Sequence, residues 1–141
     1  MSQLKLAALI CHGLAIVPML IGGLVYATRE SYLSYHATAT AYTWEELTPG
    51  MQTLLQAMLN GAGGLMVLVS TVLLILLCIP FKNNDRWSFW AIPLIGISAI
   101  LITIRAAFYV AINTPSNPPW QWLLILICLF ISGWLLSYKS N

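Results

Sequence analysis

The sequence predicts an all-helical membrane protein built as an antiparallel bundle of four transmembrane helices. Hydrophobic residues make up 60% of the chain and charged residues only 7%, whereas soluble domains carry roughly a quarter charged residues. Short polar segments also separate four apolar runs, each of about 18 residues or more, which is long enough to cross a bilayer as a helix. We therefore expect a single domain over residues 1–141, with helices near 6–27, 50–80, 87–112 and 120–138.

The first apolar run, residues 6–27, follows a single lysine at position 5. A signal peptide is the alternative, because a lysine followed by an apolar stretch loosely fits that pattern. The apolar region is longer than a typical signal core, so we expect a retained membrane helix. Pro18 removes a backbone donor, and we expect the helix to bend there.

Residues 28–49 form the only sizeable polar segment. Its first part, "TRESYLSYH", can prolong the first helix to the level of the headgroups, where tyrosine is favoured. Thr43 and Glu46 have the spacing of a capping box, which predicts a short helix lying at the membrane interface. Thr48 followed by Pro49 predicts the start of the second helix.

The three later runs are separated by breaks that no membrane helix would continue through. The second run, residues 50–80, exceeds the length needed to cross a bilayer, so it either tilts or begins outside the hydrocarbon. The polar loop "KNNDR" separates it from the third run. The segment "NTPSNPP" contains three prolines and separates the third run from the fourth.

Lysine and arginine residues near the helix ends predict the orientation. If the four helices alternate in direction, one side of the membrane receives Lys5, Lys82, Arg86 and Lys139. The other side receives Arg29 together with Glu30, Glu45 and Glu46. Cytoplasmic loops carry an excess of Lys and Arg. We therefore expect both termini in the cytoplasm and the loop over residues 28–49 outside.

Arg105 is the main candidate for a functional residue, because it lies inside the third apolar run. Counted from Ile112, it lies about 10 Å from the outer interface. Its side chain can snorkel to the headgroups or pair with a loop carboxylate. Alternatively, it can bind an anionic or carbonyl group at the end of a cavity, since ionisable residues inside membranes are commonly functional.

Polar residues on two helices are expected to converge near Arg105. Gln52, Gln56 and Asn60 recur at every fourth position and therefore share one face of the second helix. Tyr109 lies one turn from Arg105 on the third helix. We therefore expect a ligand-binding set, closed from the loop by its last two members: Arg105, Tyr109, Gln52, Gln56, Asn60, Glu46 and His36. The alternative is a hydrogen-bond network that holds the helices together.

Small residues on the second helix predict a close helix contact. Ala57, Gly61 and Gly64 fall on one stripe, a pattern that lets two helix backbones approach; the alternative is a lipid chain lying against the bare backbone. In the first helix, His12 has no acid or second histidine at ligand spacing. We expect it to be a hydrogen-bonded structural residue.

Several classes of function are excluded by what the sequence lacks. It contains no H-E-x-x-H motif, no glycine-rich phosphate loop and no basic run for nucleic acid. The acidic residues all lie in loops, so the membrane interior offers no obvious general acid or base. Cys11, Cys78 and Cys128 lie in different apolar runs, as packing residues do. We expect no metal, no cofactor and no enzyme activity.

Two segments in the middle half of the chain carry a resemblance to known proteins. The residues are "YHATATAYTWEELTPGMQTLLQAMLNGAGG" and, after an apolar run, "PFKNNDRWSFW". They resemble a group of small bacterial integral membrane proteins of unknown function. The resemblance implies a four-helix protein of the bacterial inner membrane and implies no activity. Two other four-helix classes differ: the eicosanoid and glutathione metabolism family by its E-R-x-x-x-N signature, and the small multidrug transporters by their membrane-embedded glutamate.

These observations favour a non-enzymatic protein that binds a lipid or amphiphilic small molecule in a pocket of the outer leaflet. The alternative is an accessory or assembly subunit of a larger membrane complex, or a homo-oligomer, as the small-residue stripes indicate. A small transporter is the third hypothesis, although four helices rarely enclose a pathway without oligomerising.

Overall fold

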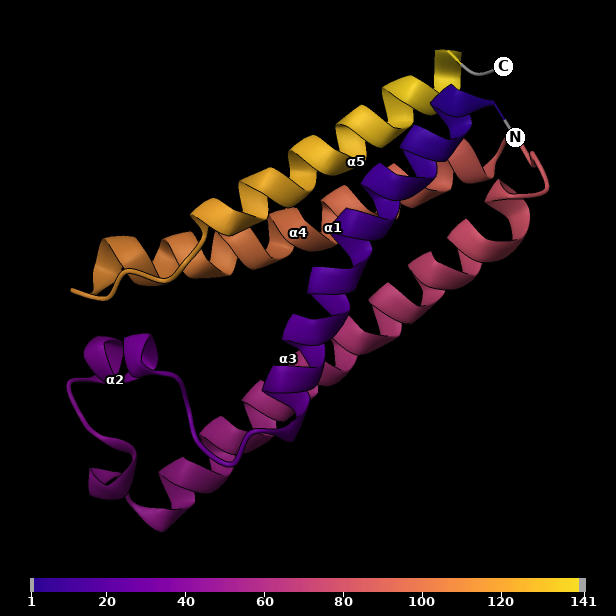
Figure 1. Ribbon diagram of the computed structural model, residues 1–141. Coiled ribbons are helices and arrows are strands. Elements are labelled where there is room, and N and C mark those ends of the chain that lie inside the picture. The colour runs from indigo at the N-terminus through magenta and orange to yellow at the C-terminus, as the bar shows by residue number, and fades with distance from the viewer. Residues whose placement is uncertain (1, 140–141) are drawn as a thin grey trace.

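The computed structural model describes residues 2–139, which form helices and turns and contain no strand (Figure 1). The long helices are α1 (Gln3–Thr28), α3 (Pro49–Leu76), α4 (Ser88–Asn113) and α5 (Gln121–Lys139). A π-helical turn, η2 (Leu77–Phe81), extends α3, and two short helices lie between α1 and α3: α2 (Ser34–Thr40) and the 3₁₀ turn η1 (Trp44–Glu46). Within this described range, four helices are long and apolar enough to cross a membrane. The predicted all-helical class with four such helices is confirmed.

Helices α1 and α3 begin where the sequence places capping residues. Ser2 Oγ accepts a hydrogen bond from the backbone nitrogen of Lys5 at 3.2 Å. Thr48 caps α3 in the same way, with Met51 as the donor and Pro49 at the first helical position. Both caps satisfy backbone donors that a helix start leaves unpaired. The predicted turn after Thr43 is also present, and Glu46 Oε2 accepts from the Thr43 nitrogen at 2.7 Å.

The segment between α1 and η1 differs from expectation. Residues 29–36 do not prolong the first helix as expected, because α1 ends at Thr28 and the chain becomes extended at Arg29. A separate helix, α2, forms five residues later. Its first turn is closed by a hydrogen bond from the Leu33 nitrogen to Nδ1 of His36, at 3.1 Å.

The four long helices are close together at one end of the molecule, which we call the terminal end because it holds residues 2–5 and 136–139 (Figure 1). Lys5 Nζ donates there to the backbone oxygen of Lys82 at 2.9 Å and to Asn84 Oδ1 at 2.5 Å. These bonds fasten the start of α1 to the α3–α4 connection. The largest fully buried apolar side chains, grouped in one core, are Phe81, Phe130, Ile16, Leu73, Ile92 and Ile100.

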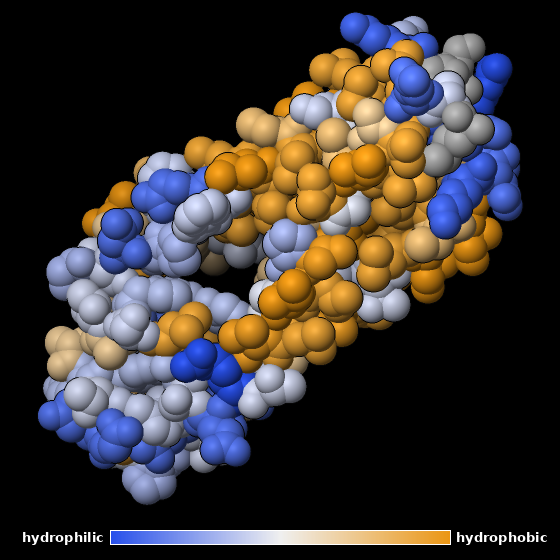
Figure 2. All heavy atoms as spheres, viewed as in Figure 1, coloured by the Kyte–Doolittle hydropathy of each residue, from blue (hydrophilic) through white to orange (hydrophobic). Residues whose placement is uncertain are grey.

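Towards the opposite end, which we call the loop end because it holds residues 28–49, the helices separate into two pairs (Figure 1). α4 and α5 lie side by side, with aromatic contacts at both ends. The ring centroids of Trp90 and Trp134 are 4.8 Å apart, and those of Phe108 and Trp120 are 6.2 Å apart. α1 leaves α5 and lies along α3 instead. An opening therefore separates α4 from α1 and α3 at the loop end, and it is visible in the space-filling view (Figure 2).

The α1–α3 contact depends on Gly63. A Cβ atom on this residue would lie 2.3 Å from the backbone nitrogen of Ala27 and 2.7 Å from the oxygen of Gly23. No other residue type fits so close to a neighbouring backbone. The stripe of small residues predicted from the sequence does not make this contact. Gly61 and Gly64 have nothing within 4 Å of the Cβ position and are exposed, as is Ala57. The helix is thus rotated so that Gly63, and not that stripe, meets α1.

The α1–α5 contact places His12 in the core. Its side chain is fully buried, and a Cβ atom on Gly133 would lie 2.7 Å from its ring. The rings of Phe81 and Phe130 lie 5.7 and 5.8 Å away. Within residues 2–139, neither ring nitrogen has a hydrogen-bond partner. The expected hydrogen bond of a structural histidine is therefore not found in the described chain.

The outer surface between the two ends is apolar. Orange, hydrophobic atoms form a band across the middle of Figure 2, and hydrophilic atoms gather at both ends. Ile102 is 72% exposed and Leu94 is 69% exposed. Apolar patches of such extent on a soluble monomer would favour aggregation, whereas in a bilayer they contact acyl chains. This distribution agrees with four membrane-spanning helices.

Candidate functional site

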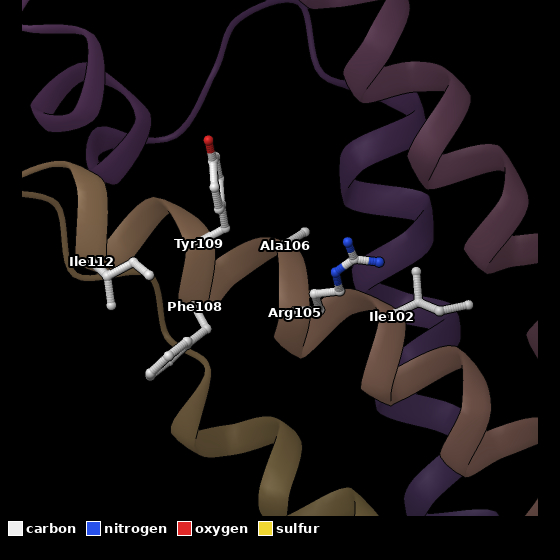
Figure 3. Close-up of a pocket in the computed structure, with 6 residues that line it drawn as sticks. All are labelled: Ile102, Arg105, Ala106, Phe108, Tyr109 and Ile112. Carbon is white, nitrogen blue, oxygen red and sulfur yellow. The ribbon is translucent and has the colours of Figure 1, made fainter.

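The side of the opening formed by α4 carries a pocket of about 550 Å³. All six lining residues are exposed, so this is an open recess on the surface of α4 and not an enclosed cavity. One helix supplies the whole lining (Figure 3): Ile102, Arg105, Ala106, Phe108, Tyr109 and Ile112. The pocket is mainly apolar, with one charged group and one phenol.

Arg105 and Tyr109 point to the same side of α4, since they are four residues apart on a helix. Figure 3 shows both side chains directed across the opening, towards α1 and the loop end, while Phe108 points the other way. Both residues are exposed, and Tyr109 is 68% exposed. At 1.5 Å per residue, Arg105 lies about 12 Å along α4 from its last residue, Asn113.

The guanidinium of Arg105 has no ion-pair or hydrogen-bond partner among residues 2–139. The expected glutamate partners of the loop do not reach it. Glu46 is instead occupied by the backbone nitrogen of Thr43, and that hydrogen bond lowers the pKa of its exposed carboxyl group. A charge in an apolar surrounding without a partner is costly. Arg105 is thus available to a group from outside the described chain.

The polar stripe of α3 lies on one helical face, and its bonds go to the loop and to α1. Gln52 Nε2 donates to the backbone oxygen of Trp44 at 2.7 Å. The side-chain oxygen and nitrogen of Asn60 are assigned from their surroundings: only with the nitrogen facing α1 does the amide pair, donating to the backbone oxygens of Tyr26 at 3.0 Å and Arg29 at 3.2 Å. The last carbonyl oxygens of a helix have no partner within the helix, so Asn60 caps the end of α1.

Gln56 lies between Gln52 and Asn60 on this face and is half-buried. Of the seven residues predicted for the site, only Arg105 and Tyr109 line the α4 pocket. Gln52, Asn60 and Glu46 position the loop. The structure therefore brings the predicted residues to the same end of the molecule, in two separate groups.

His36 belongs to the second group, within a cluster of aromatic residues that sequence reasoning missed. Its ring centroid lies 4.0 Å from that of Tyr35, 6.0 Å from Tyr32 and 6.2 Å from Tyr26. Burial, with a smaller contribution from the nearby positive charge of Arg29, lowers the pKa of His36. The available signal was the number of aromatic rings in a short segment, with Tyr32, Tyr35 and His36 within five residues.

Tyr35 connects this cluster to the other helix pair. Burial, followed by its hydrogen bond to the hydroxyl of Tyr26, raises the pKa of the Tyr35 phenol. The backbone oxygen of Tyr35 accepts a hydrogen bond from the buried hydroxyl of Ser116 at 2.5 Å. Ser116 lies in the α4–α5 connection, so α2 contacts both sides of the opening.

Metal ligation finds no support in the described part of the chain. Residues 2–139 hold no group of three or more His, Cys, Asp or Glu side chains arranged around one point. The three thiols are free, and Cys78 and Cys128 are exposed on the outer surface. They therefore face away from the core, in contrast to the packing role expected of them.

Comparisons of this chain with protein families, with curated proteins and with solved structures find no match.

Proposed function

We propose that this protein binds a membrane amphiphile with an anionic headgroup in the opening at the loop end, and that it does so without catalysing a reaction. The observation that carries the proposal is the Arg105 guanidinium, which faces the opening and has no partner within residues 2–139. A guanidinium binds carboxylates and phosphates through two parallel hydrogen bonds. An anionic headgroup therefore supplies the partner that the rest of the chain does not.

The remaining residues of the pocket suit the other parts of such a ligand. The Tyr109 hydroxyl, one turn nearer the loop end, can donate a second hydrogen bond to the headgroup. Ile102 and Ile112 provide apolar surface for an acyl or isoprenoid chain. The opening continues into the apolar outer surface, so a lipid can move sideways from the bilayer into the pocket (Figure 2).

The proposal places the loop end on the outer face of a bacterial inner membrane, with both termini in the cytoplasm. The charged residues of the terminal end support this orientation. Ser34 and Asn83 are exposed at opposite ends of the molecule. In a background without native cysteines, Ser34→Cys should react with a membrane-impermeant thiol reagent in intact cells, and Asn83→Cys only after lysis. The reverse pattern would overturn the orientation.

Native mass spectrometry of the protein purified in mild detergent tests the binding itself. The wild type should retain an anionic lipid, and Arg105→Ala should reduce that retention roughly 10- to 100-fold, as expected for the loss of a charged hydrogen bond. Arg105→Lys keeps the charge but not the paired geometry, so it should retain an intermediate amount. Equal retention by the wild type and Arg105→Ala would refute the proposal.

Arg86→Ala is the matched control, because Arg86 is exposed at the terminal end, in the α3–α4 connection. It removes the same charge from the molecule without touching the pocket. Its lipid retention should equal that of the wild type. A similar loss for both alanine variants would mean that anionic lipid binds non-specifically through net charge.

The second candidate function is that of an accessory subunit or homo-oligomer. The exposed positions of Gly61 and Gly64, which have nothing within 4 Å of their Cβ sites, favour it, because small residues on an outer face let another helix approach. Crosslinking in native membranes with Ala57→Cys distinguishes the two functions. Reproducible adducts with a second membrane protein or a second copy would support it, and their absence would count against it.

A further inference from the structure

The short helix α2 forms the outer wall of the opening. On one side, the hydroxyl groups of Tyr26 and Tyr35 are hydrogen-bonded, which fastens α2 to the end of α1. On the other side, Ser116 Oγ donates to the Tyr35 backbone oxygen at 2.5 Å. In Figures 1 and 2, α2 lies between the end of the α4–α5 pair and the end of α3. α2 thus spans the loop end of the opening, beyond the pocket of Arg105 and Tyr109, which α4 alone lines.

The contacts that hold α2 in this place are few. The helix has only seven residues and none of them is buried, so little stability comes from packing, and helices this short are marginal on their own. Its last turn ends at Ala41, with φ of 60°, a conformation that is disfavoured for a residue with a Cβ atom. Its first turn has no Ser, Thr, Asp or Asn cap.

The first turn depends instead on the protonation state of His36. Its Nδ1 accepts the hydrogen bond from the Leu33 nitrogen at 3.1 Å, and only an unprotonated nitrogen can accept. A protonated imidazole carries a proton on both nitrogens, so this bond is lost. The neutral ring has the position that Glu or Gln occupies in a capping box.

The surroundings of His36 oppose its protonation. α1 contributes Tyr26, the connection after it contributes the positively charged Arg29 and Tyr32, and α2 itself contributes Tyr35. From α3, the residue that lines this cluster is Leu59, which does not titrate. No carboxylate in the described chain is paired with the imidazole. A proton on His36 therefore places a second cation beside Arg29.

We propose that α2 is an acid-sensitive lid across the loop end of the opening, held closed by neutral His36 and released when Nδ1 of His36 is protonated. Protonation removes the acceptor for the Leu33 nitrogen and adds repulsion from Arg29. α2 then unwinds, and its hydrogen bond to Ser116 breaks. That the opening holds an amphiphile rests on the proposed function, but the movement of α2 can be measured without any ligand.

The direction of the pH dependence follows from linkage. The closed state lowers the pKa of His36, and the open state restores the ordinary value near 6.5. The closed state therefore has its full stability above about pH 6.5 and loses it as the pH falls below that value. For a single proton, each decrease of one pH unit raises the ratio of open to closed molecules by at most about tenfold.

Distances between spin labels on α2 and α5 test the lid. Thr38 and Gln121 are both exposed, and Thr38→Cys with Gln121→Cys can carry labels in a background without native cysteines. At pH 7.5 the wild type should give one narrow distance distribution, and at pH 5 a second, longer population should appear. An unchanged distribution across this range would overturn the proposal.

Two variants of His36 separate its titration from unfolding of the loop. His36→Gln keeps a hydrogen-bond acceptor but does not titrate, so the lid should stay closed at both pH values. His36→Ala lacks the acceptor, so the open population should be present at both. Opening of His36→Gln at pH 5 to the same extent as the wild type would assign the response to another group and refute the role of His36.

The same samples distinguish failure of the lid from failure of the proposed function. The lid should respond to pH in Arg105→Ala as it does in the wild type, because Arg105 makes no contact with α2 in the described chain. A lid that opens with acid while Arg105→Ala retains lipid normally would refute the function alone. Lipid retention that depends on Arg105, with α2 immobile, would refute the lid alone.

Discussion

Gly63→Ala should destabilise the protein more than any other glycine-to-alanine change in α3. The added Cβ atom would lie 2.3 Å from the Ala27 nitrogen and 2.6 Å from the Tyr26 carbonyl carbon, where ordinary contacts are 3.4–4 Å. Both neighbours are backbone atoms, which cannot rotate away as a side chain can. α1 and α3 must therefore separate by about 1 Å, at a typical cost of 1–3 kcal/mol.

Gly61→Ala is the matched control, two residues away on the same helix. Nothing lies within 4 Å of its Cβ position, so only the intrinsic helix preference of alanine remains, a gain of about 0.5–1 kcal/mol. That gain is common to both variants. The difference between their free energies of unfolding thus isolates the steric cost at Gly63, about 1–3 kcal/mol.

Reversible unfolding in mixed micelles with increasing SDS fraction, followed by far-ultraviolet circular dichroism, measures this difference. Gly63→Ala should unfold at a lower SDS fraction than the wild type, and Gly61→Ala at an equal or higher one. Equal stability of the two variants would refute the α1–α3 contact described above and the rotation of α3 on which it depends.

Four further predictions concern the two ends of the molecule. Lys5→Met should lower the free energy of unfolding by about 1.5–3 kcal/mol in the same micelle assay, because charged hydrogen bonds to the α3–α4 connection are lost; an unchanged value would show that these bonds contribute nothing. Asn60→Leu leaves the last carbonyls of α1 unpaired, which should cost about 1 kcal/mol of local stability. Hydrogen exchange of the amides in the last turn of α1 should therefore accelerate by roughly fivefold or more. Unaltered exchange would contradict the role of Asn60 as a cap of α1. Hydrogen exchange of the α2 amides should accelerate as the pH falls below about 6.5, after correction for intrinsic rates. Ala41→Gly should slow this exchange at every pH, because glycine relieves about 1–2 kcal/mol of left-handed strain. A faster exchange in that variant would contradict the strain at Ala41.

The membrane helices could be predicted closely from the sequence because long apolar runs mark the spans and capping residues mark where helices start. The third run was expected at 87–112 and the helix covers 88–113. The start of α3 at Pro49 followed from the Thr48 cap and the proline after it. These features are local, so no knowledge of the tertiary structure is needed to find them.

The rotation of α3 could not be predicted, because "NGAGG" offers several glycines and the sequence does not say which of them meets α1. The stripe of Gly61 and Gly64 satisfied the small-residue pattern, yet Gly63 makes the contact. The same rotation directs Gln52 and Asn60 to the loop and α1. A helical pattern identifies a face, whereas the neighbour of that face is decided by the packing of all four helices.

α2 was missed for a similar reason. Its sequence, "SYHATAT", has no apolar periodicity and no cap, so no local signal predicts a helix. Contacts from distant residues form it, including the hydroxyl of Ser116, which is 81 positions from Tyr35. For Arg105, the sequence predicted the end of the molecule on which it lies, while its lack of a glutamate partner emerged only from the arrangement of the loop.

The density beside Arg105 in an experimental map, from crystals grown in a lipid phase, tests the central claim most directly. The account predicts an elongated feature in the opening, with its head within hydrogen-bonding distance of the Arg105 guanidinium and its tail along Ile102 and the neighbouring apolar surface. An opening filled only by disordered solvent, or a guanidinium paired directly with Glu30, Glu45 or Glu46, would contradict it.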